Sequence, residues 1–433
     1  MKRILMTLLA FSVAWTASAA TTRNDDSCDI ALLPAATLLL PYFEVDLDDP
    51  NGSTTLFTIT NVTSVEQIAR VTLWTDHAFP VITFNIYLTG YDVQSINMYD
   101  LIGRGVIGPE LGTGTTITQR GHYSDPNQTL DLSRCDRLPG WIDDSYVDRM
   151  QLAFTEGRVP AVGILAGCDS AGQVHENAIG YATIDVVRMC EESFPTDAAY
   201  WTNEIGYANA LAGDYQHVDR GSRFADGGPM VHIRAVPEGG ASPPAFPRTF
   251  YSRYQAPATP KLDARQPLPA LHAARWIDGG PGTYRTSMKV WREEKTGAGA
   301  TCAQYAASNL RKFVEIVNFD EAENAIANVS DIRVPGYFPY TFAATSMTSV
   351  QDSNIYPIFY ASTVAGWMYL NLNDPDDETA AQAWVIASMR AEGQFSVDVN
   401  AIAFGNGCSA KVRPSEVGVG TTVIAPLPNK RNP

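Results

Sequence analysis

The sequence has no apolar run long enough to cross a membrane. Its first apolar run, Ile4–Trp15, holds about a dozen residues, whereas a membrane-spanning helix needs about 20. No later stretch is long and apolar enough to replace it. We therefore expect a chain without a membrane span.

Positive charge is scarce. The 433 residues include 31 Lys and Arg against 47 Asp and Glu, a formal net charge of −16 at pH 7. Nucleic acids and anionic lipid head groups bind through clusters of Lys and Arg. The charge balance therefore argues against both as partners. With 45% hydrophobic and 10% aromatic residues, the chain is too apolar to be disordered, and we expect a folded protein.

The motifs of familiar metal and nucleotide enzymes are also missing. There is no C-x-x-C pair and no two histidines three to five residues apart, so a zinc site is not expected. There is no G-x-S-x-G and no H-E-x-x-H. Gly112-Thr113-Gly114 lacks the third glycine of a dinucleotide-binding loop. These absences favour a protein that is not an enzyme.

The first twenty residues are typical of a secretory signal peptide. Lys2 and Arg3 precede the apolar run, and Ala17-Ser18-Ala19 supplies a small-residue cleavage site. We therefore expect residues 1–20 to be removed and the rest to be secreted, into the periplasm or the extracellular medium.

Six cysteines fit that expectation, because thiols of exported proteins oxidise to disulfides. Six cysteines allow 15 pairings. Cys302 and Cys408 are alone in the last third of the chain, so we expect them to pair with each other. The disulfide candidates are Cys28, Cys135, Cys168, Cys190, Cys302 and Cys408.

Short runs with β-type composition dominate the chain. In residues 83–88 apolar and polar side chains alternate, which indicates a strand with one buried face. In residues 395–400 Phe395, Val397 and Val399 alternate with polar residues in the same way. The expected strands cover residues 37–45, 54–61, 69–75, 81–88, 92–98, 161–165, 178–187, 230–235, 284–291, 312–318, 356–362, 367–372, 383–389 and 394–400, with helices at 143–158 and near 198–211.

This pattern predicts a mainly β protein of two antiparallel β-sandwich domains, immunoglobulin-like in general architecture, with one or two short helices. A mature chain of roughly 410 residues is too long for one core, and residues 236–269 are rich in proline. The expected divisions are a signal peptide (1–20), an N-terminal domain with a helical insertion (28–240), a Pro-rich linker (241–270), a C-terminal domain (271–408) and a loose tail (409–433).

Two local echoes suggest an internal duplication. Residues 46–50, DLDDP, resemble residues 371–375, NLNDP. Residues 71–76, VTLWTD, resemble residues 314–320, VEIVNFD. Both echoes are short, so a single domain type used twice and two unrelated domains both stay open.

An ordered set of short blocks resembles a group of secreted bacterial β-rich proteins of unknown activity. The resemblance extends over nearly the whole mature chain but implies no catalytic or binding residues. The blocks are LLLPYFEVD, TLFTITN, VTLWTD, YLTGYDVQSINMYDL, GYATIDVV, MVHIRA, the turn at residues 275–280, KVWRE and GWMYLNLN.

Two acidic segments are candidates for calcium, the one cofactor we consider, because carboxylate oxygens are the ligands it prefers. Neither has EF-hand spacing, since Pro50 takes the place of the third ligand when Asp46 is the first. A solvated turn is the favoured explanation of such segments. The candidate ligands are Asp46, Asp48 and Asp49 in the first segment and Asp374, Asp376 and Asp377 in the second.

His175 and Glu176, an adjacent pair of histidine and carboxylate, are the catalytic candidates. Neighbours in a strand point to opposite faces, so adjacency alone does not place them together. We therefore predict a non-catalytic secreted or cell-surface protein for adhesion, assembly or ligand binding, with an extracellular protein or glycan as partner. The alternative is a secreted hydrolase, acting on polysaccharide, on the same β-rich scaffold.

Overall fold

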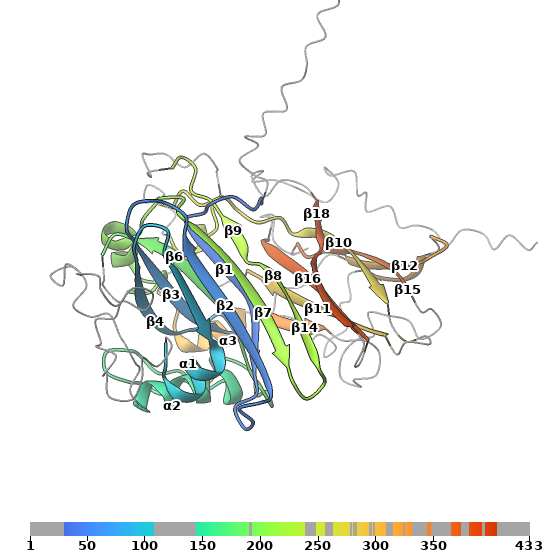
Figure 1. Cartoon of the computed structure of the whole chain (residues 1–433), viewed down its shortest axis with the longest axis horizontal. Helices are drawn as coiled ribbons and strands as arrows, with labels where there is room; N and C mark the ends of the chain where they lie inside the picture. Colours follow the sequence, from blue (N-terminus) through green and yellow to red (C-terminus); the bar gives the residue numbers. More distant parts are fainter. Residues whose placement is uncertain are drawn as a thin grey trace, which may run out of the picture.

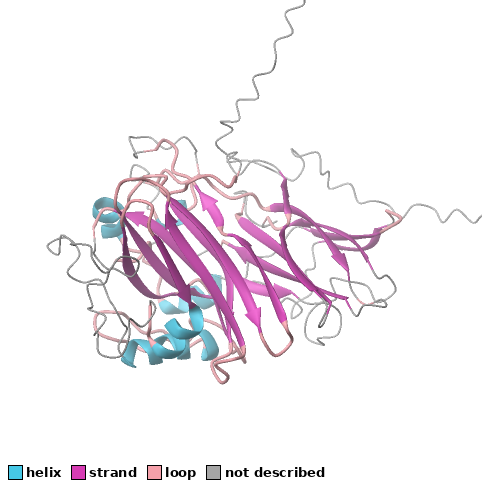
Figure 2. Ribbon diagram, viewed as in Figure 1, coloured by secondary structure: helices cyan, strands magenta, loops and turns pink. Residues whose placement is uncertain are grey.

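The structure is a computed structural model, and it confirms a mainly β chain with several antiparallel sheets (Figures 1 and 2). Within the described residues no helix is both long and apolar enough to cross a membrane. The residues that the structure describes are 30–107, 144–189, 193–238, 248–255, 263–277, 279, 284–293, 297, 299–308, 315–323, 325–330, 344–347, 365–373, 381–391 and 395–404.

The first half of the chain forms a five-stranded and a four-stranded sheet. The five-stranded sheet has the order β4-β3-β6-β1-β9, and the four-stranded sheet has the order β5-β2-β7-β8. β1 packs against β2 and β7, which brings the two sheets together. The strands are β1 (Thr37–Val45), β2 (Ser53–Asn61), β3 (Gln67–Thr75), β4 (Pro80–Leu88), β5 (Val93–Asn97), β6 (Ala178–Val187), β7 (Leu211–Asp219), β8 (Phe224–Pro229) and β9 (Val231–Ile233).

The second half forms another such pair of sheets. Their orders are β13-β12-β15-β10-β18 and β14-β11-β16-β17. The strands are β10 (Leu271–Ile277), β11 (Tyr284–Arg292), β12 (Glu315–Asp320), β13 (Ala325–Ser330), β14 (Ala344–Met347), β15 (Ala365–Asn371), β16 (Ala383–Ala391), β17 (Phe395–Asn400) and β18 (Ile402–Phe404).

The two halves share one topology. Adding nine to each strand number of the first two sheets gives the strand order of the second two, for both the five-stranded and the four-stranded sheet. We call the halves the first and the second repeat. The echo of VTLWTD and VEIVNFD fits this relation, because its members lie on the equivalent strands β3 and β12. The echo of DLDDP and NLNDP does not, because its members follow β1 and β15, which are not equivalent.

The central strands of the second four-stranded sheet, β11 and β16, are buried on both faces. Met288 and Val290 of β11 belong to the core of the second repeat, whereas Trp291 belongs to the core of the first. In β16, Val385 lies in the second core and Ile386 in the first. A sheet covered on both sides tolerates apolar residues at successive positions, and residues 383–388 of β16 are all buried.

Part of the predicted Pro-rich linker lies in the core of the first repeat. Phe250, Tyr251 and Leu268 are at most 1% exposed and belong to that core. Arg265 is fully buried, donates to Gly206 O at 3.0 Å and lies 3.6 Å from Asp185 Oδ1. The described residues of this segment therefore pack as part of the fold.

Short helices complete the described part. They are α1 (Met98–Arg104), α2 (Asp144–Glu156), α3 (Cys302–Ser308), a π-helical turn at Tyr200–Glu204 and a 3₁₀ turn at Ser252–Tyr254. α2 is the helix predicted at 143–158. Gly157 ends it with φ of +64°, a left-handed conformation that glycine adopts without strain.

Several sequence-based element predictions are wrong. Residues 161–165 form a tight turn closed by the Val162 and Leu165 bridge. The helix expected near 198–211 is limited to Tyr200–Glu204, and β7 begins at Leu211. Residues 271–277, partly assigned to a turn, form β10. The strand expected at 356–362 lies outside the described residues.

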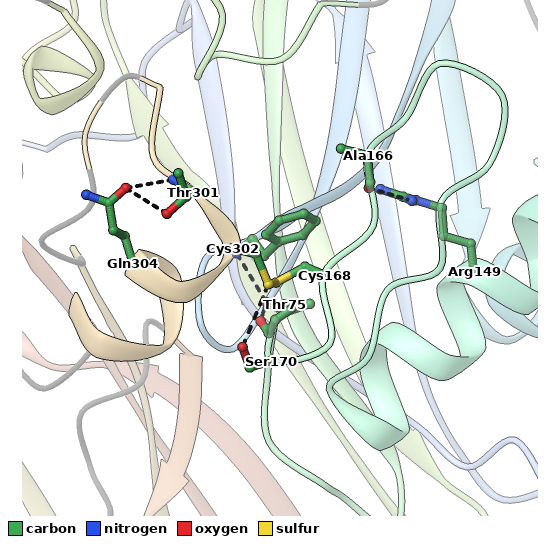
Figure 3. Close-up of a disulfide and its surroundings, with 10 residues drawn as sticks. Thr75, Arg149, Ala166, Cys168, Ser170, Thr301, Cys302 and Gln304 are labelled. Atoms are coloured by element: carbon green, nitrogen blue, oxygen red, sulfur yellow. Dashed lines mark hydrogen bonds between the residues drawn. A yellow bond between two sulfur atoms is a disulfide. The ribbon is translucent and has the colours of Figure 1, made fainter.

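Cys302 pairs with Cys168, which corrects the expected pairing of Cys302 with Cys408. Cys168 lies in the loop before β6, and Cys302 begins α3, which lies beside the strands of the first repeat (Figures 1 and 3). Tyr305 of α3 packs edge-to-face on Phe79 at 5.0 Å between ring centroids. The disulfide therefore joins the two repeats. Cys28, Cys135, Cys190 and Cys408 lie outside the described residues.

Removing this disulfide should weaken the fold measurably. The bond closes a sequence separation of 134 residues, and loss of a native disulfide typically lowers the free energy of unfolding by about 2–5 kcal/mol. We expect a decrease of that size for the double variant Cys168→Ser, Cys302→Ser, measured by chemical denaturation. Ser170→Ala is the control, since its hydroxyl only contacts Cys302 Sγ, at 3.7 Å. Equal unfolding free energies for wild type and double variant would contradict the pairing.

Candidate functional site

His175 meets a carboxylate, but not that of Glu176. His175 Nε2 lies 3.0 Å from Asp76 Oδ2, and the two side chains are 21% and 2% exposed. Glu176 is exposed and has no part in this contact. The partner of His175 is therefore 99 positions away in the sequence, at the end of β3.

The hydrogen bonds around this pair indicate a structural role. Asp76 Oδ1 accepts the backbone N–H of Gln173 at 3.1 Å. The Gln173 side chain in turn lies 3.2 Å from His77 Nε2. Burial lowers the pKa of His77 below its usual value of 6.5. Among the described residues, no Ser, Thr or Cys side chain hydrogen-bonds to His175, so the pair has no hydroxyl or thiol to activate.

The first calcium candidate is a self-contained turn between β1 and β2. Asp46 Oδ1 accepts the N–H groups of Asp48 and Asp49, at 2.9 and 3.1 Å. Asp49 Oδ1 accepts the N–H of Asn51 at 2.8 Å. Asp and Asn make such turns with their own backbone. Calcium binding at this turn stays a prediction. The second candidate, Asp374, Asp376 and Asp377, lies outside the described residues.

A buried ionic cluster lies where the two four-stranded sheets meet. β8 and β17, which are equivalent strands of the two repeats, contact each other there. Ser396 Oγ joins them by accepting the N–H of Ala225 at 3.1 Å. We call the polar side chains on the inner face of this junction the seam cluster; they are Tyr215, His217, Asp226, Lys289, Ser388 and Asp398.

Strand register places four of these side chains, His217, Asp226, Ser388 and Asp398, in one row. His217 of β7 is paired with Thr55 on one side and with Asp226 of β8 on the other. Across the junction, Asp398 of β17 is paired with Ser388 of β16. Residues paired across antiparallel strands point to the same face. The row therefore extends over five strands of the two repeats.

The charges of the seam cluster are held almost out of water. Lys289 Nζ lies 3.5 Å from Asp226 Oδ1 and 3.5 Å from Asp398 Oδ2. The three side chains are 7%, 0% and 1% exposed in that order. The Ser388 hydroxyl donates to Asp226 Oδ2, and the Tyr215 hydroxyl donates to Asp398 Oδ2 at 3.4 Å.

Burial shifts the protonation of two members of the cluster. The pKa of Asp226 is raised to about 7, first by burial and then by the nearby Asp398, against the opposing effect of Lys289. The pKa of His217 is lowered well below 6.5 by burial and by the positive charge of Lys289. His217 is therefore neutral at pH 7, and Asp226 takes up a proton more readily than an ordinary aspartate.

Three members of the cluster could offer ligand atoms to a metal ion. One atom each of His217, Asp226 and Asp398 lie within 4.8 Å of one another. His217 Nδ1 is taken by Thr55 Oγ1 at 2.9 Å, and Nε2 has no hydrogen-bond partner. The ammonium of Lys289 already contacts both carboxylates, however, and it would repel a divalent cation. The residues present therefore fit an internal ion pair better than a metal centre.

A cavity of about 540 Å³ lies on the outer face of the first four-stranded sheet, and we call it the groove. α1 forms one wall through Asp100 and Arg104. The Asn97 side chain caps the N-terminus of this helix. Asp100 and Arg104 lie one turn apart, and their side chains form an ion pair at 3.0 Å. The lining residues are Leu56, Phe57, Thr58, Ser95, Ile96, Asn97, Asp100, Arg104, Val106, Ile107, Asp214 and Gln216.

Neither the seam cluster nor the groove was predicted from the sequence. The alternation in residues 395–400 predicts a strand with one buried face, but the apolar face of this strand is the exposed one. Phe395, Val397 and Val399 are 50%, 42% and 49% exposed, while the Asp398 side chain is 1% exposed. Alternation separates two faces of a strand without saying which one is buried.

Comparison of the chain with protein-family models, with curated proteins and with solved structures finds no match.

The low pKa of His217 predicts a loss of stability in acid. Below pH 6.5 an unfolded histidine binds a proton that buried His217 does not, so stability falls as pH decreases. For one histidine this loss approaches about 2 kcal/mol between pH 7.5 and 5. Denaturation of wild type and His217→Gln at both pH values should show a smaller loss in the variant. Equal losses would contradict the buried neutral state of His217.

Proposed function

We propose that the chain is a non-catalytic exported protein that captures a polar, hydroxyl-rich ligand, an oligosaccharide, in the groove. The observation that carries this proposal is the groove itself. Its volume of about 540 Å³ lies within the range of about 300–1,000 Å³ that is usual for ligand sites.

The lining of the groove suits a ligand that both donates and accepts hydrogen bonds. Arg104 offers donors only, Asp100 and Asp214 offer acceptors, and Thr58, Ser95 and Gln216 offer both. The Arg104 and Asp100 side chains are 51% and 33% exposed, so they reach the solvent. Sugar hydroxyls match such a mixture, because each one donates and accepts.

The groove is set on a rigid scaffold. Its strand residues come from β2, β5 and β7, which are neighbours in one sheet. Phe57 and Ile96 are 1% exposed and anchor its floor in the core. Side chains on paired strands lose little further freedom on binding, which favours affinity.

The reactive groups of the described chain support binding over catalysis. The Asp76 and His175 pair lacks a hydroxyl or thiol partner among the described residues, and the seam cluster is buried. The alternative, a hydrolase acting on polysaccharide, rests on two carboxylates lining the groove, Asp100 and Asp214, since glycosidases use such a pair.

We also propose the finer points of architecture and location. The sheets of each repeat would form a β-sandwich, immunoglobulin-like in general architecture, with the domain boundary in the segment 241–270. Residues 1–20 would direct the chain out of the cytoplasm, to the periplasm or the medium. The disulfide between Cys168 and Cys302 supports an oxidising compartment.

Binding to an array of neutral and acidic oligosaccharides tests this function. For the wild-type protein we expect saturable binding to one class of glycan. Asp214→Ala should weaken it by tenfold or more, because a hydrogen bond to a charged group contributes about 1.5–3 kcal/mol. Asp214 is exposed, so the variant should fold normally.

Glu66→Ala is the matched control, since Glu66 is an exposed acidic residue outside the groove. Unchanged affinity in Asp214→Ala would place the ligand elsewhere, and absence of glycan binding by the wild type would refute the proposal. Release of new reducing ends from a bound oligosaccharide would instead establish the hydrolase.

A further inference from the structure

Lys289 is an unusual lysine because its amine is buried between two carboxyl groups. It lies on β11, and its side chain is 7% exposed. Close ion pairs between ammonium and carboxylate have N to O distances of about 2.7–2.9 Å. The two distances at Lys289 are both 3.5 Å. Both are longer than the distances of close ion pairs, so the amine lies beside the Asp226 carboxyl group, whose carbon it would attack, without forming a close ion pair with either acid.

Asp226 has the properties of an electrophile. A carboxylate resists attack by an amine, whereas a neutral carboxylic acid accepts it. The Asp226 side chain is fully buried, and its raised pKa keeps part of the molecules protonated at pH 7. The hydroxyl of Ser388 donates to Asp226 Oδ2, which polarises the carboxyl group further.

Asp398 is placed to move protons between the two. Its Oδ2 lies 3.5 Å from Lys289 Nζ, and a carboxyl oxygen of Asp398 lies within 4.8 Å of one of Asp226. Its other oxygen, Oδ1, is buried without a hydrogen-bond partner. Asp398 therefore lies beside both groups and retains a free acceptor.

The surroundings exclude water. The rings of Tyr215 and His217 pack at 5.1 Å, and Tyr42 of β1 packs on His217 at 6.0 Å between centroids. Water that leaves a closed site of this kind does not readily return to hydrolyse a product. Such a site favours condensation of an amine with an acid over the reverse reaction.

We propose that Lys289 Nζ and the side-chain carboxyl carbon of Asp226 condense into an intramolecular amide bond, with Asp398 as the proton carrier. The Lys289 ammonium gives one proton to the Asp398 carboxylate, and the free amine attacks the carboxyl carbon of protonated Asp226. The C–N bond forms as the carbonyl electron pair moves to oxygen.

The tetrahedral intermediate then collapses. Through Asp398, the hydroxyl that leaves gains a proton and the nitrogen loses one. The C–O bond breaks, one water molecule leaves, and Asp398 ends as the carboxylic acid, because it keeps one of the protons that the ammonium carried. One ammonium, one carboxylic acid and one carboxylate thus give one amide, one water and one carboxylic acid, with no change of oxidation state and no added reagent.

The bond would join β8 of the first repeat to β11 of the second, across 63 positions of sequence. It would also replace a buried positive and a buried negative charge by one neutral amide, which removes the cost of keeping both ions out of water. Together with the Cys168 and Cys302 disulfide, it would attach the second repeat to the first at two separate points.

Mass spectrometry of the reduced, alkylated wild-type protein tests the proposal directly. Trypsin should leave Lys289 uncut and yield residues 224–234 joined to residues 286–292, lighter than the sum of the two peptides by one water. Lys289→Met and Asp226→Ala should each lack this joined product, and Asp398→Asn should form it more slowly or not at all. Glu66→Ala, which removes an exposed acid outside both the groove and the seam cluster, is the matched control and should keep it.

The wild-type digest decides the matter even if a variant fails to fold. Free peptides 224–234 and 286–289 as the main products from folded wild-type protein would overturn the proposal. A joined product that links Lys289 to Asp398 instead would overturn the assignment to Asp226. A divalent metal retained in native mass spectra, and lost in His217→Gln, would also overturn it, because the same carboxylates would then be ligands.

Discussion

Burial of β11 and β16, the central strands of the second four-stranded sheet, on both faces is the constraint that joins the repeats. On one face Val290 and Val385 pack in the second core, and on the other Trp291 and Ile386 pack in the first. Burying one such side chain contributes about 1.5–3 kcal/mol. A second repeat separated from the first would expose that whole face to water, so the halves share one interior although each has its own complete set of strands.

This shared interior explains where the buried charges lie. The seam cluster forms where the edges of the two sheets meet, and Arg265 holds the connecting segment against β1 and Asp185. Breaking a buried ion pair by removing one partner costs about 3–5 kcal/mol, because the remaining charge is uncompensated. Any other orientation of the second repeat would leave such charges buried without a partner. The pairs therefore give the contact between the repeats a specificity that apolar packing alone lacks.

The bounds of several strands could be predicted from the sequence, whereas contacts between residues far apart in the chain could not. The bounds of β1 and β6 match the expected strands, because their apolar runs are bounded by turn residues. The hairpin of β7 and β8 was missed, since Phe224–Pro229 contains glycine, aspartate and proline, which are depleted in strands. The partners of His175, Cys302 and Lys289 lie 99, 134 and 63 positions away, and only the assembled sheets bring them together.

The contact of β8 with β17 also bears on the history of the chain. A lone ancestral repeat would present its β8 strand as an open edge, and open edges pair with whatever strand they meet. The most available strand of that kind is the same edge of an identical molecule. Duplication within one chain would turn this encounter into an internal one at a high, fixed effective concentration. In the present chain β8 and β17 contact each other, so each repeat covers the edge at which the other could pair with a further molecule.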